Sequence, residues 1–201
     1  WFLLFIFLLL SLFIVLLLPI ESRNLCLQLA LLSLPLILFY PSAKRWFKFP
    51  QFILAICWGF SVLIPWAASQ SSLTGEISLL FCWLATLFWT FGFDTVYAMA
   101  DELDDKKIGL NSSALSLGDK SLSAVSLSYL LSCIFLGIGA FKANLGWFFW
   151  PFWLLSTFGM QREIYLLKFK QKGIKASGKH FKNQVWLGSL ILVGMILSKV
   201  I

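Results

Sequence analysis

The sequence predicts an all-α, multi-pass transmembrane helical bundle, and three observations support this prediction. The chain of 201 residues is 60% hydrophobic and 12% charged, with a mean hydropathy of +0.87, whereas soluble domains are about half apolar and about a quarter charged. Its apolar residues form long runs, and its basic residues gather in the short segments between them. The expected solvent for most of this chain is therefore the lipid bilayer.

Seven apolar runs are expected to be membrane-spanning helices, because about 20 residues at about 1.5 Å per residue cross the hydrocarbon core. They cover residues 1–19, 25–40, 51–68, 77–93, 121–141, 146–167 and 184–201. The first run follows no basic segment and has no small-residue cleavage site, so it is interpreted as a span and not as a signal peptide. The second is short and contains Pro35, which predicts a kink. Because the chain begins with Trp1 instead of Met, its true N-terminus is expected to lie upstream.

The charges between the runs predict an orientation. Thirteen of the sixteen Lys and Arg residues lie in or beside segments 40–50, 94–120 and 162–182, at one set of helix ends, and only Arg23, Lys142 and Lys199 do not. By the positive-inside rule these segments are expected on the cytoplasmic side, in the bacterial inner membrane or its equivalent. The net charge of +7 is therefore attributed to orientation in the membrane, and no nucleic-acid partner is expected.

Acidic residues are concentrated in one of these segments. Six of the nine carboxylates are Asp94, Asp101, Glu102, Asp104, Asp105 and Asp119. If the helix of residues 77–93 continues, one helical face carries Asp94, Tyr97, Asp101, Asp104 and Asp105. Like charges at this spacing repel one another, so the arrangement favours a bound cation. Mg²⁺ takes one or two carboxylates together with water and phosphate oxygens, and the Asp101–Asp105 spacing supplies two carboxylates one turn apart.

The alternative is a solvated, acid-rich loop that simply ends a helix at the membrane surface. Three features favour a functional site instead. Asp94 lies at the edge of an apolar run, where an unpaired charge is costly. Tyr97 can hydrogen-bond to a carboxylate or a phosphate. Residues 106–118 place bases, hydroxyls and glycines beside the acids, as a phosphate-binding loop would.

Two segments resemble one family. DTVYAMADELDDKKIGLNSSALSLG, residues 94–118, resembles the second Asp-rich motif of the UbiA superfamily of intramembrane prenyltransferases, in the branch that prenylates 4-hydroxybenzoate. FYPSAKRWFKFPQFILAICWGFSVLIPWAA, residues 39–68, is similar to the YPxxKR, PQ and GxxxxIPxA pattern of that branch. Residues 180–188 resemble the start of its last helix more loosely. Branches that make haem O, menaquinone or chlorophyll carry different residues around the second motif and rank below.

The resemblance implies an activity and a set of site residues. The activity is Mg²⁺-dependent transfer of a polyprenyl group from polyprenyl diphosphate to the ring of 4-hydroxybenzoate, for ubiquinone or plastoquinone. By this resemblance, Asp101 and Asp105 hold Mg²⁺ with support from Asp94 and Asp104, and Tyr40 and Lys44 contact the diphosphate, with Arg45 as a weaker candidate. From their positions in the sequence, Lys107 is a further candidate for the diphosphate, and Tyr97 and Asn183 are candidates for the substrate cavity. The alternative role of Asn183 is that of a plain helix-start cap. Asp101, Asp105 and Lys44 are the expected catalytic residues. For Lys44 and Arg45 the alternative role is that of ordinary membrane-surface anchors.

The chain also departs from the family. The family has nine spans and a first Asp-rich motif, NDxxDxxxD, after its second span, whereas this chain has seven expected spans and no such motif. Its first run would correspond to the third span of the family. Residues 1–201 are therefore expected to form one integral-membrane domain that lacks two helices and half of the metal site, and to be inactive by themselves.

Competing hypotheses belong to other classes. A non-catalytic membrane scaffold or relic protein is one, and a divalent-cation transporter is another. A transporter predicts acids at mid-span, and none of the seven runs holds an acid near its centre. A phosphatidyl-alcohol transferase would require a DGxxAR motif, which the sequence lacks. His180, the single histidine, is expected to face solvent at the membrane surface and not to act as a base.

Overall fold

The computed structural model describes residues 2–169 and 174–200 and is built from helices in both ranges. The seven apolar runs form α1 (Phe2–Leu16), α2 (Ile20–Ala43), α3 (Pro50–Gln70), α4 (Ile77–Ala100), α7 (Ser121–Lys142), α8 (Phe149–Phe169) and α9 (Ile174–Val200). Between α4 and α7 lie α5 (Glu102–Ile108), α6 (Ser113–Leu117) and the short 3-10 helix η1 (Gly118–Lys120). The predicted all-α bundle is confirmed.

Length and apolarity distinguish the long helices from one another. In the described residues, five segments are long and apolar enough to cross a membrane: Ile20–Ala43, Pro50–Gln70, Ile77–Ala100, Ser113–Lys142 and Ala176–Lys199. Helix α1 has only 15 residues, and the second half of α8 carries Arg162, Glu163 and Lys168. All seven predicted runs are therefore helices, but α1 is shorter and α8 is more charged than is typical of a complete span.

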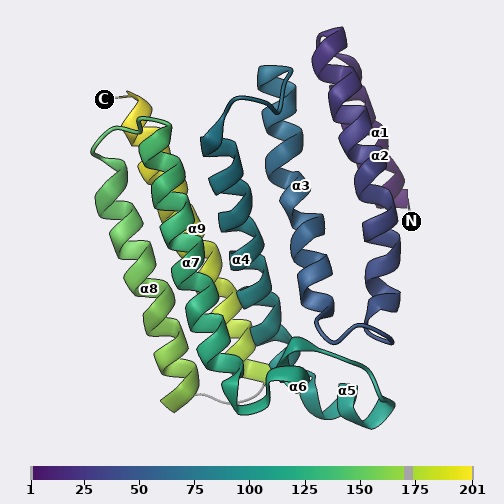
Figure 1. Ribbon diagram of the computed structural model, residues 1–201, viewed down its shortest axis with the longest axis vertical. Helices are drawn as coiled ribbons and strands as arrows, with labels where there is room; N and C mark the ends of the chain where they lie inside the picture. Colours follow the sequence, from purple (N-terminus) through teal and green to yellow (C-terminus); the bar gives the residue numbers. More distant parts are fainter. Residues whose placement is uncertain (1, 170–173, 201) are drawn as a thin grey trace.

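The helices are arranged roughly in a row. Figure 1 shows α2, α3, α4, α7 and α8 following one another across the molecule, with α1 next to α2 and α9 behind α4 and α7. The most extensive contact joins α4 to α7, and α9 packs on α8 and α4. One core, around Tyr129, Phe149 and Met160, fills the space between α4, α7, α8 and α9. A second, around Cys26 and Phe60, joins α2 to α3.

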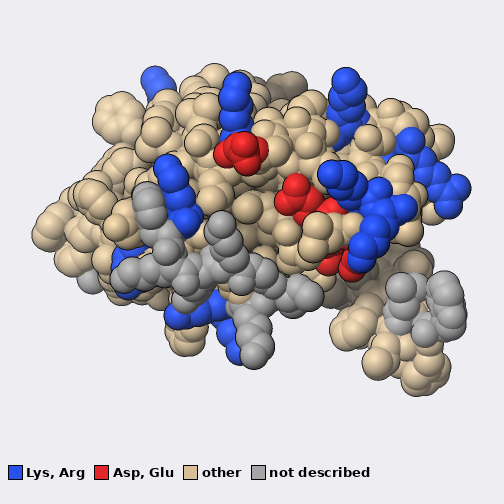
Figure 2. Space-filling view, turned by 90° about the horizontal axis from the view of Figure 1, so that it is seen from below, with Lys and Arg blue, Asp and Glu red and all other residues tan. Residues whose placement is uncertain are grey.

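The charged segments meet at one end of the bundle. The α2–α3 connection, the α5–α6 segment, the C-terminal end of α8 and the N-terminal end of α9 all lie at the lower end in Figure 1. Figure 2 views this end and shows acidic side chains with Lys and Arg side chains around them. The prediction that the basic and acidic segments lie at the same end of the bundle is confirmed for the described residues. Lys170 and Lys172, which the sequence assigns to the same end, lie outside the described residues, and so does the side chain of Lys175.

Close packing of α4 on α7 depends on Gly92. A Cβ atom at Gly92 would lie 2.8 Å from Cε1 of Tyr129, whose side chain is fully buried. We expect Gly92→Ala to destabilise the fold by about 1–3 kcal/mol through overpacking, measured as a lower thermal midpoint in detergent. Gly178→Ala in α9 is the matched control, because among the described residues no atom outside its own stretch of helix backbone lies within 4 Å of its added Cβ. An unchanged midpoint for Gly92→Ala would contradict the described α4–α7 packing.

Candidate active site

The C-terminal end of α2 reaches toward the acidic residues of α4 and α5. The Tyr40 hydroxyl donates a hydrogen bond to Oδ2 of Asp94 at 3.5 Å. One turn further along, Nζ of Lys44 lies 3.6 Å from Oδ2 of Asp105. Tyr40 and Lys44 share a helix face because they are four residues apart. Two motifs that are distant in the sequence therefore converge on one site.

The ion pair between Lys44 and Asp105 is partly shielded from water. The side chain of Asp105 is 7% exposed and that of Lys44 is 29% exposed. Oδ2 of Asp105 is buried and receives no hydrogen bond from the described residues. Nζ of Lys44, at 3.6 Å, is close enough for an ion pair with this oxygen but not for a hydrogen bond to it. A buried carboxylate oxygen with spare acceptor capacity is suited to a further cation.

The acidic segment is not one continuous helix. Helix α4 ends at Ala100, and Asp101 (φ −95°, ψ 2°) caps both α4 and α5. The carbonyl of Asp101 accepts hydrogen bonds from the backbone N–H groups of Asp104 and Asp105, at 3.0 and 2.8 Å. The predicted one-turn spacing of Asp101 and Asp105 is confirmed. The predicted single face running from Asp94 to Asp105 is wrong, because the break at Asp101 separates α5 from the face of α4.

This break places two predicted site residues on the outside. The side chain of Asp104 is 80% exposed and forms an ion pair with Lys107, itself 75% exposed, at 3.1 Å. Asp104 and Lys107 therefore form an exposed pair separate from the Lys44–Asp105 pair. Arg45 is also exposed, and Tyr97 is 58% exposed.

Asn183 and the expected metal-binding carboxylates are also arranged differently from the prediction. Asn183 is half-buried and lines a cavity of about 210 Å³ between α8 and α9, together with Glu163, so it is separate from the acids of α4 and α5. In residues 2–169 and 174–200, no three His, Cys, Asp or Glu side chains gather closely enough to hold a metal ion. The four predicted carboxylates are therefore not assembled into one cluster in this structure.

The segment after α5 is fixed to its neighbours by hydrogen bonds. The N–H of Ser113 donates to Oε1 of Gln51 at 2.7 Å, and its hydroxyl bonds to that of Thr95 at 2.7 Å. The N–H of Asn111 donates to the carbonyl of Lys44 at 2.6 Å. The Ser112 hydroxyl caps α6 by accepting from the N–H of Leu115. The hydroxyls that the sequence suggested for phosphate binding at Ser112 and Ser113 are buried. The first caps α6 and the second binds Thr95 of α4.

A cavity adjoins the site on the same face of α4. It lies between α3, α4 and α9, has a volume of about 490 Å³, and is lined by Leu54, Trp58, Thr86, Trp89, Thr90, Phe93, Phe181, Gln184, Val185 and Gly188. Thr90 precedes Asp94 by four residues, which is one helical turn. The wall of this cavity is mainly aromatic and aliphatic, and its α4 side leads toward the Asp94 carboxylate.

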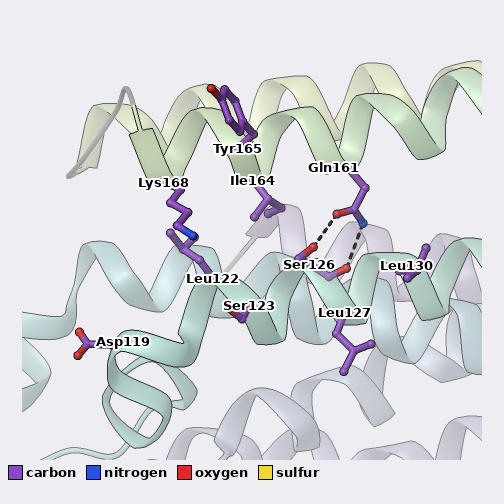
Figure 3. A pocket seen from close by; sticks show the side chains of 10 residues that line it. All are labelled: Asp119, Leu122, Ser123, Ser126, Leu127, Leu130, Gln161, Ile164, Tyr165 and Lys168. Atoms are coloured by element: carbon purple, nitrogen blue, oxygen red, sulfur yellow. Dashed lines mark hydrogen bonds between the residues drawn. The ribbon is translucent and has the colours of Figure 1, made fainter.

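A second hollow lies on a different face. Figure 3 shows this groove of about 620 Å³ between α7 and α8, with Asp119 and Lys168 near one end. Gln161 of α8 crosses it to Ser126 of α7, accepting from the serine hydroxyl at 2.6 Å and donating to the serine carbonyl at 3.0 Å. Asp94 and Asp105 do not line this groove, so it is not part of the candidate site.

His180 does not face solvent as expected. Its side chain is 2% exposed, its Nε2 is 2.8 Å from the hydroxyl of Tyr129, and its Nδ1 is 3.9 Å from Oε2 of buried Glu163. The prediction was wrong because α9 begins well before residue 184 and carries His180 into the contact with α7 and α8. The isolated acid Glu163 within an apolar run was the sequence signal for such a buried polar group.

Comparison with known proteins decides the family. The model of the UbiA prenyltransferase family matches residues 2–190. This chain belongs to the UbiA prenyltransferase family. It is 40% identical over 173 residues to the 4-hydroxybenzoate solanesyltransferase of Synechocystis sp., covering 85% of this chain and 58% of that protein. It is 31% identical over 183 residues to the 4-hydroxybenzoate octaprenyltransferase of Thiobacillus denitrificans, covering 90% of this chain and 60% of that protein.

The UbiA fold is also seen in a solved structure of a digeranylgeranylglyceryl phosphate synthase. The two structures superpose with a TM-score of 0.68 at 20% identity, covering 96% of this chain and 66% of that one. The likeness supports a shared arrangement of helices. This chain spans about three-fifths of the length of the curated UbiA-family relatives named above.

Sequence reasoning missed two glutamines in this UbiA-family chain. Gln51 and Gln184 are 1% and 3% exposed; Gln51 anchors the segment after α5, and Gln184 lines the α3–α4–α9 cavity. Gln51 belongs to the PQ pattern and Gln184 to residues 180–188, both of which resemble the family, but the sequence assigns neither glutamine a contact. A buried amide requires partners, and those partners lie on other helices.

Proposed function

We propose that the protein transfers a polyprenyl group from polyprenyl diphosphate to the aromatic ring of 4-hydroxybenzoate, in ubiquinone or plastoquinone biosynthesis. The observation that carries this proposal is the meeting of Tyr40 and Lys44 with Asp94 and Asp105 beside an aromatic cavity. A phosphate-binding cation, a phenol and carboxylates are the groups that a diphosphate site needs. The names of the two curated relatives support the same reaction.

Asp101 and Asp105 are the residues proposed to hold Mg²⁺. The fit rests on the buried Oδ2 of Asp105, which lacks a hydrogen-bond donor among the described residues, and on the backbone bond that keeps Asp101 one turn away. Mg²⁺ takes one or two protein carboxylates and completes its shell with phosphate oxygens. Bound there, it would neutralise charge on the diphosphate. Asp94 supports the site through its hydrogen bond to Tyr40.

Lys44 and Tyr40 are proposed to contact the leaving diphosphate. The allylic C–O bond breaks, and its electron pair leaves with the diphosphate. The ring carbon ortho to the hydroxyl of 4-hydroxybenzoate then bonds to the allylic cation and loses its proton. The ammonium of Lys44 stabilises negative charge as it develops on the leaving group. The Tyr40 hydroxyl, which donates to Asp94 in the structure, can donate to the same oxygens instead when the diphosphate is bound.

The α3–α4–α9 cavity is proposed to receive the reacting carbon and the acceptor. Trp58, Trp89 and Phe93 line it, and aromatic faces attract a cation through their quadrupole. A mainly apolar wall also limits water, which would otherwise capture the allylic cation.

The bilayer is the proposed source of the isoprenoid substrate. The basic residues at the site end of the bundle support a cytoplasmic position for that end, by the positive-inside rule. The expected location is the bacterial inner membrane or its equivalent, with the diphosphate at the membrane surface and the prenyl chain among the helices and lipids.

Metal removal tests the proposed function. In membranes containing the protein expressed from its complete reading frame, we expect EDTA to lower prenyl transfer to labelled 4-hydroxybenzoate by at least about 10²-fold, because several kcal/mol of charge stabilisation are lost. Added Mg²⁺ should restore the rate. Full transfer in EDTA would argue against the metal role. Absence of transfer even with Mg²⁺ would favour the scaffold or relic hypothesis.

A further inference from the structure

Gln184 is a buried amide whose oxygen is hydrogen-bonded and whose NH₂ group is not, among the described residues. Its side chain lines the 490 Å³ cavity between α3, α4 and α9 and is 3% exposed. Oε1 accepts a hydrogen bond from Nε1 of Trp89 at 2.9 Å. Nε2 is buried and has no hydrogen-bond partner among the described residues. A buried donor without an acceptor is uncommon in proteins and calls for a partner from outside the chain.

The neighbouring indole determines which end of the amide is left over. The indole N–H of Trp89 can only donate, so the amide must present its oxygen to Trp89 and its NH₂ group elsewhere. Gln161 of α8 provides a contrast, because both ends of its amide bond to Ser126 across the α7–α8 groove (Figure 3). Gln161 completes a contact between helices, whereas Gln184 retains a donor.

The position of Gln184 relative to the aspartates limits what the donor can meet. Trp89 precedes Asp94 by five residues, about 7.5 Å along α4 at 1.5 Å per residue. The diphosphate is proposed to lie at the Asp94 end, and the prenyl chain has no atoms that accept a hydrogen bond. The remaining molecule in the reaction is the aromatic substrate that receives the prenyl group, and it carries a phenol oxygen and a carboxylate.

Reaction chemistry distinguishes these two oxygens. Positive charge develops on the ring and phenol oxygen as the ring attacks the allylic cation, so a donor at the phenol oxygen would oppose the reaction. An ionised carboxylate can accept hydrogen bonds but cannot donate them. Its burial in an apolar cavity is costly unless a donor binds it. A neutral amide donor bound to a carboxylate forms a charge-assisted hydrogen bond.

We propose that Gln184 selects the aromatic acid by donating from Nε2 to the acceptor's carboxylate, with Trp89 holding the amide in the required orientation. This inference rests on the proposed function and names a specificity residue within the same site. Neighbouring side chains cover Nε2, so the carboxylate reaches it through the side-chain adjustments that commonly accompany binding. Phe93 and Phe181, whose ring centroids are 5.2 Å apart, line the same cavity.

The test measures acceptor preference in membranes containing the protein expressed from its complete reading frame. The ratio of kcat/KM for 4-hydroxybenzoate to kcat/KM for 4-methylphenol, which lacks the carboxylate, is compared between variants. We expect Gln184→Met to lower this ratio at least tenfold, with the KM for polyprenyl diphosphate unchanged within twofold. Gln161→Met is the matched control, because it removes another amide between two helices and should keep the original ratio.

A second variant protects the test against misfolding. Gln184→Glu keeps the side-chain size and the acceptor for Trp89 but removes the NH₂ group, and its ratio should fall at least threefold. If both Gln184 variants keep the original ratio while remaining active, the inference is overturned and the proposed function stands. If the unsubstituted protein does not prenylate 4-hydroxybenzoate, both are overturned.

Discussion

Asp105→Asn is expected to lower prenyl transfer by at least about 10²–10³-fold, the loss typical of removing one preorganised electrostatic group from an active site. Asp105 is the most buried of the aspartates in the acidic segment, and its Oδ2 faces Lys44 without a close donor. The amide keeps the size of the side chain but removes its charge. The measurement is the rate of polyprenyl transfer to labelled 4-hydroxybenzoate in membranes, with the amount of folded protein determined in parallel.

Asp104→Asn is the matched control for this experiment. Asp104 is the neighbouring residue, but its side chain is 80% exposed and pairs with Lys107. Its substitution should change the rate by less than threefold, because exposed ion pairs contribute about 0–1 kcal/mol. Equal losses in the two variants would show that α5 presents both carboxylates to the substrate and would contradict the exposed position of Asp104.

Lys44→Met is expected to raise the KM for polyprenyl diphosphate and to lower kcat, with a combined loss in kcat/KM of about 10²-fold or more. The substitution keeps an unbranched side chain but removes the ammonium, and it leaves Asp105 as a buried charge without its partner. Initial rates at varied diphosphate concentration measure both constants. Lys44→Arg should restore only part of the activity, because the planar guanidinium does not reproduce the position of a single ammonium.

Lys107→Met distinguishes a site lysine from a surface lysine. Lys107 is 75% exposed and bound to Asp104, so its loss should leave kcat/KM within about threefold, as expected for an exposed ion pair.

The Lys44→Met and Asp105→Asn effects should not add in the double variant, because the two groups contact each other. Additive losses would mean that the two residues act at separate places.

The elements of the fold were predictable because their signals are local. Each apolar run is long enough to require helical hydrogen bonding in a membrane, and all seven are helices. The short α5 and α6, together with the break at Asp101, were not predicted. Helix periodicity alone extends α4 through Asp105, whereas the segment after it is held by Gln51, Lys44 and Thr95, and no pattern in the sequence identifies those contacts.

The candidate site could be predicted only in part. The spacing of Asp101 and Asp105 follows from local geometry, and the pairing of Tyr40 and Lys44 on one face follows from the four-residue step. Which carboxylate each one meets depends on how α2 packs beside α4. The outward positions of Asp104 and Lys107 result from the same tertiary arrangement.

The sequence by itself determined the helical membrane class, the common end of the basic and acidic segments, and the resemblance to the UbiA family, because these depend on composition and on spacing along the chain. Tertiary structure alone decided that Lys44 reaches Asp105, that His180 is buried against Tyr129, and that Gln184 lines an aromatic cavity. The physical reason is that a buried polar group is defined by its partners, and here those partners come from different helices.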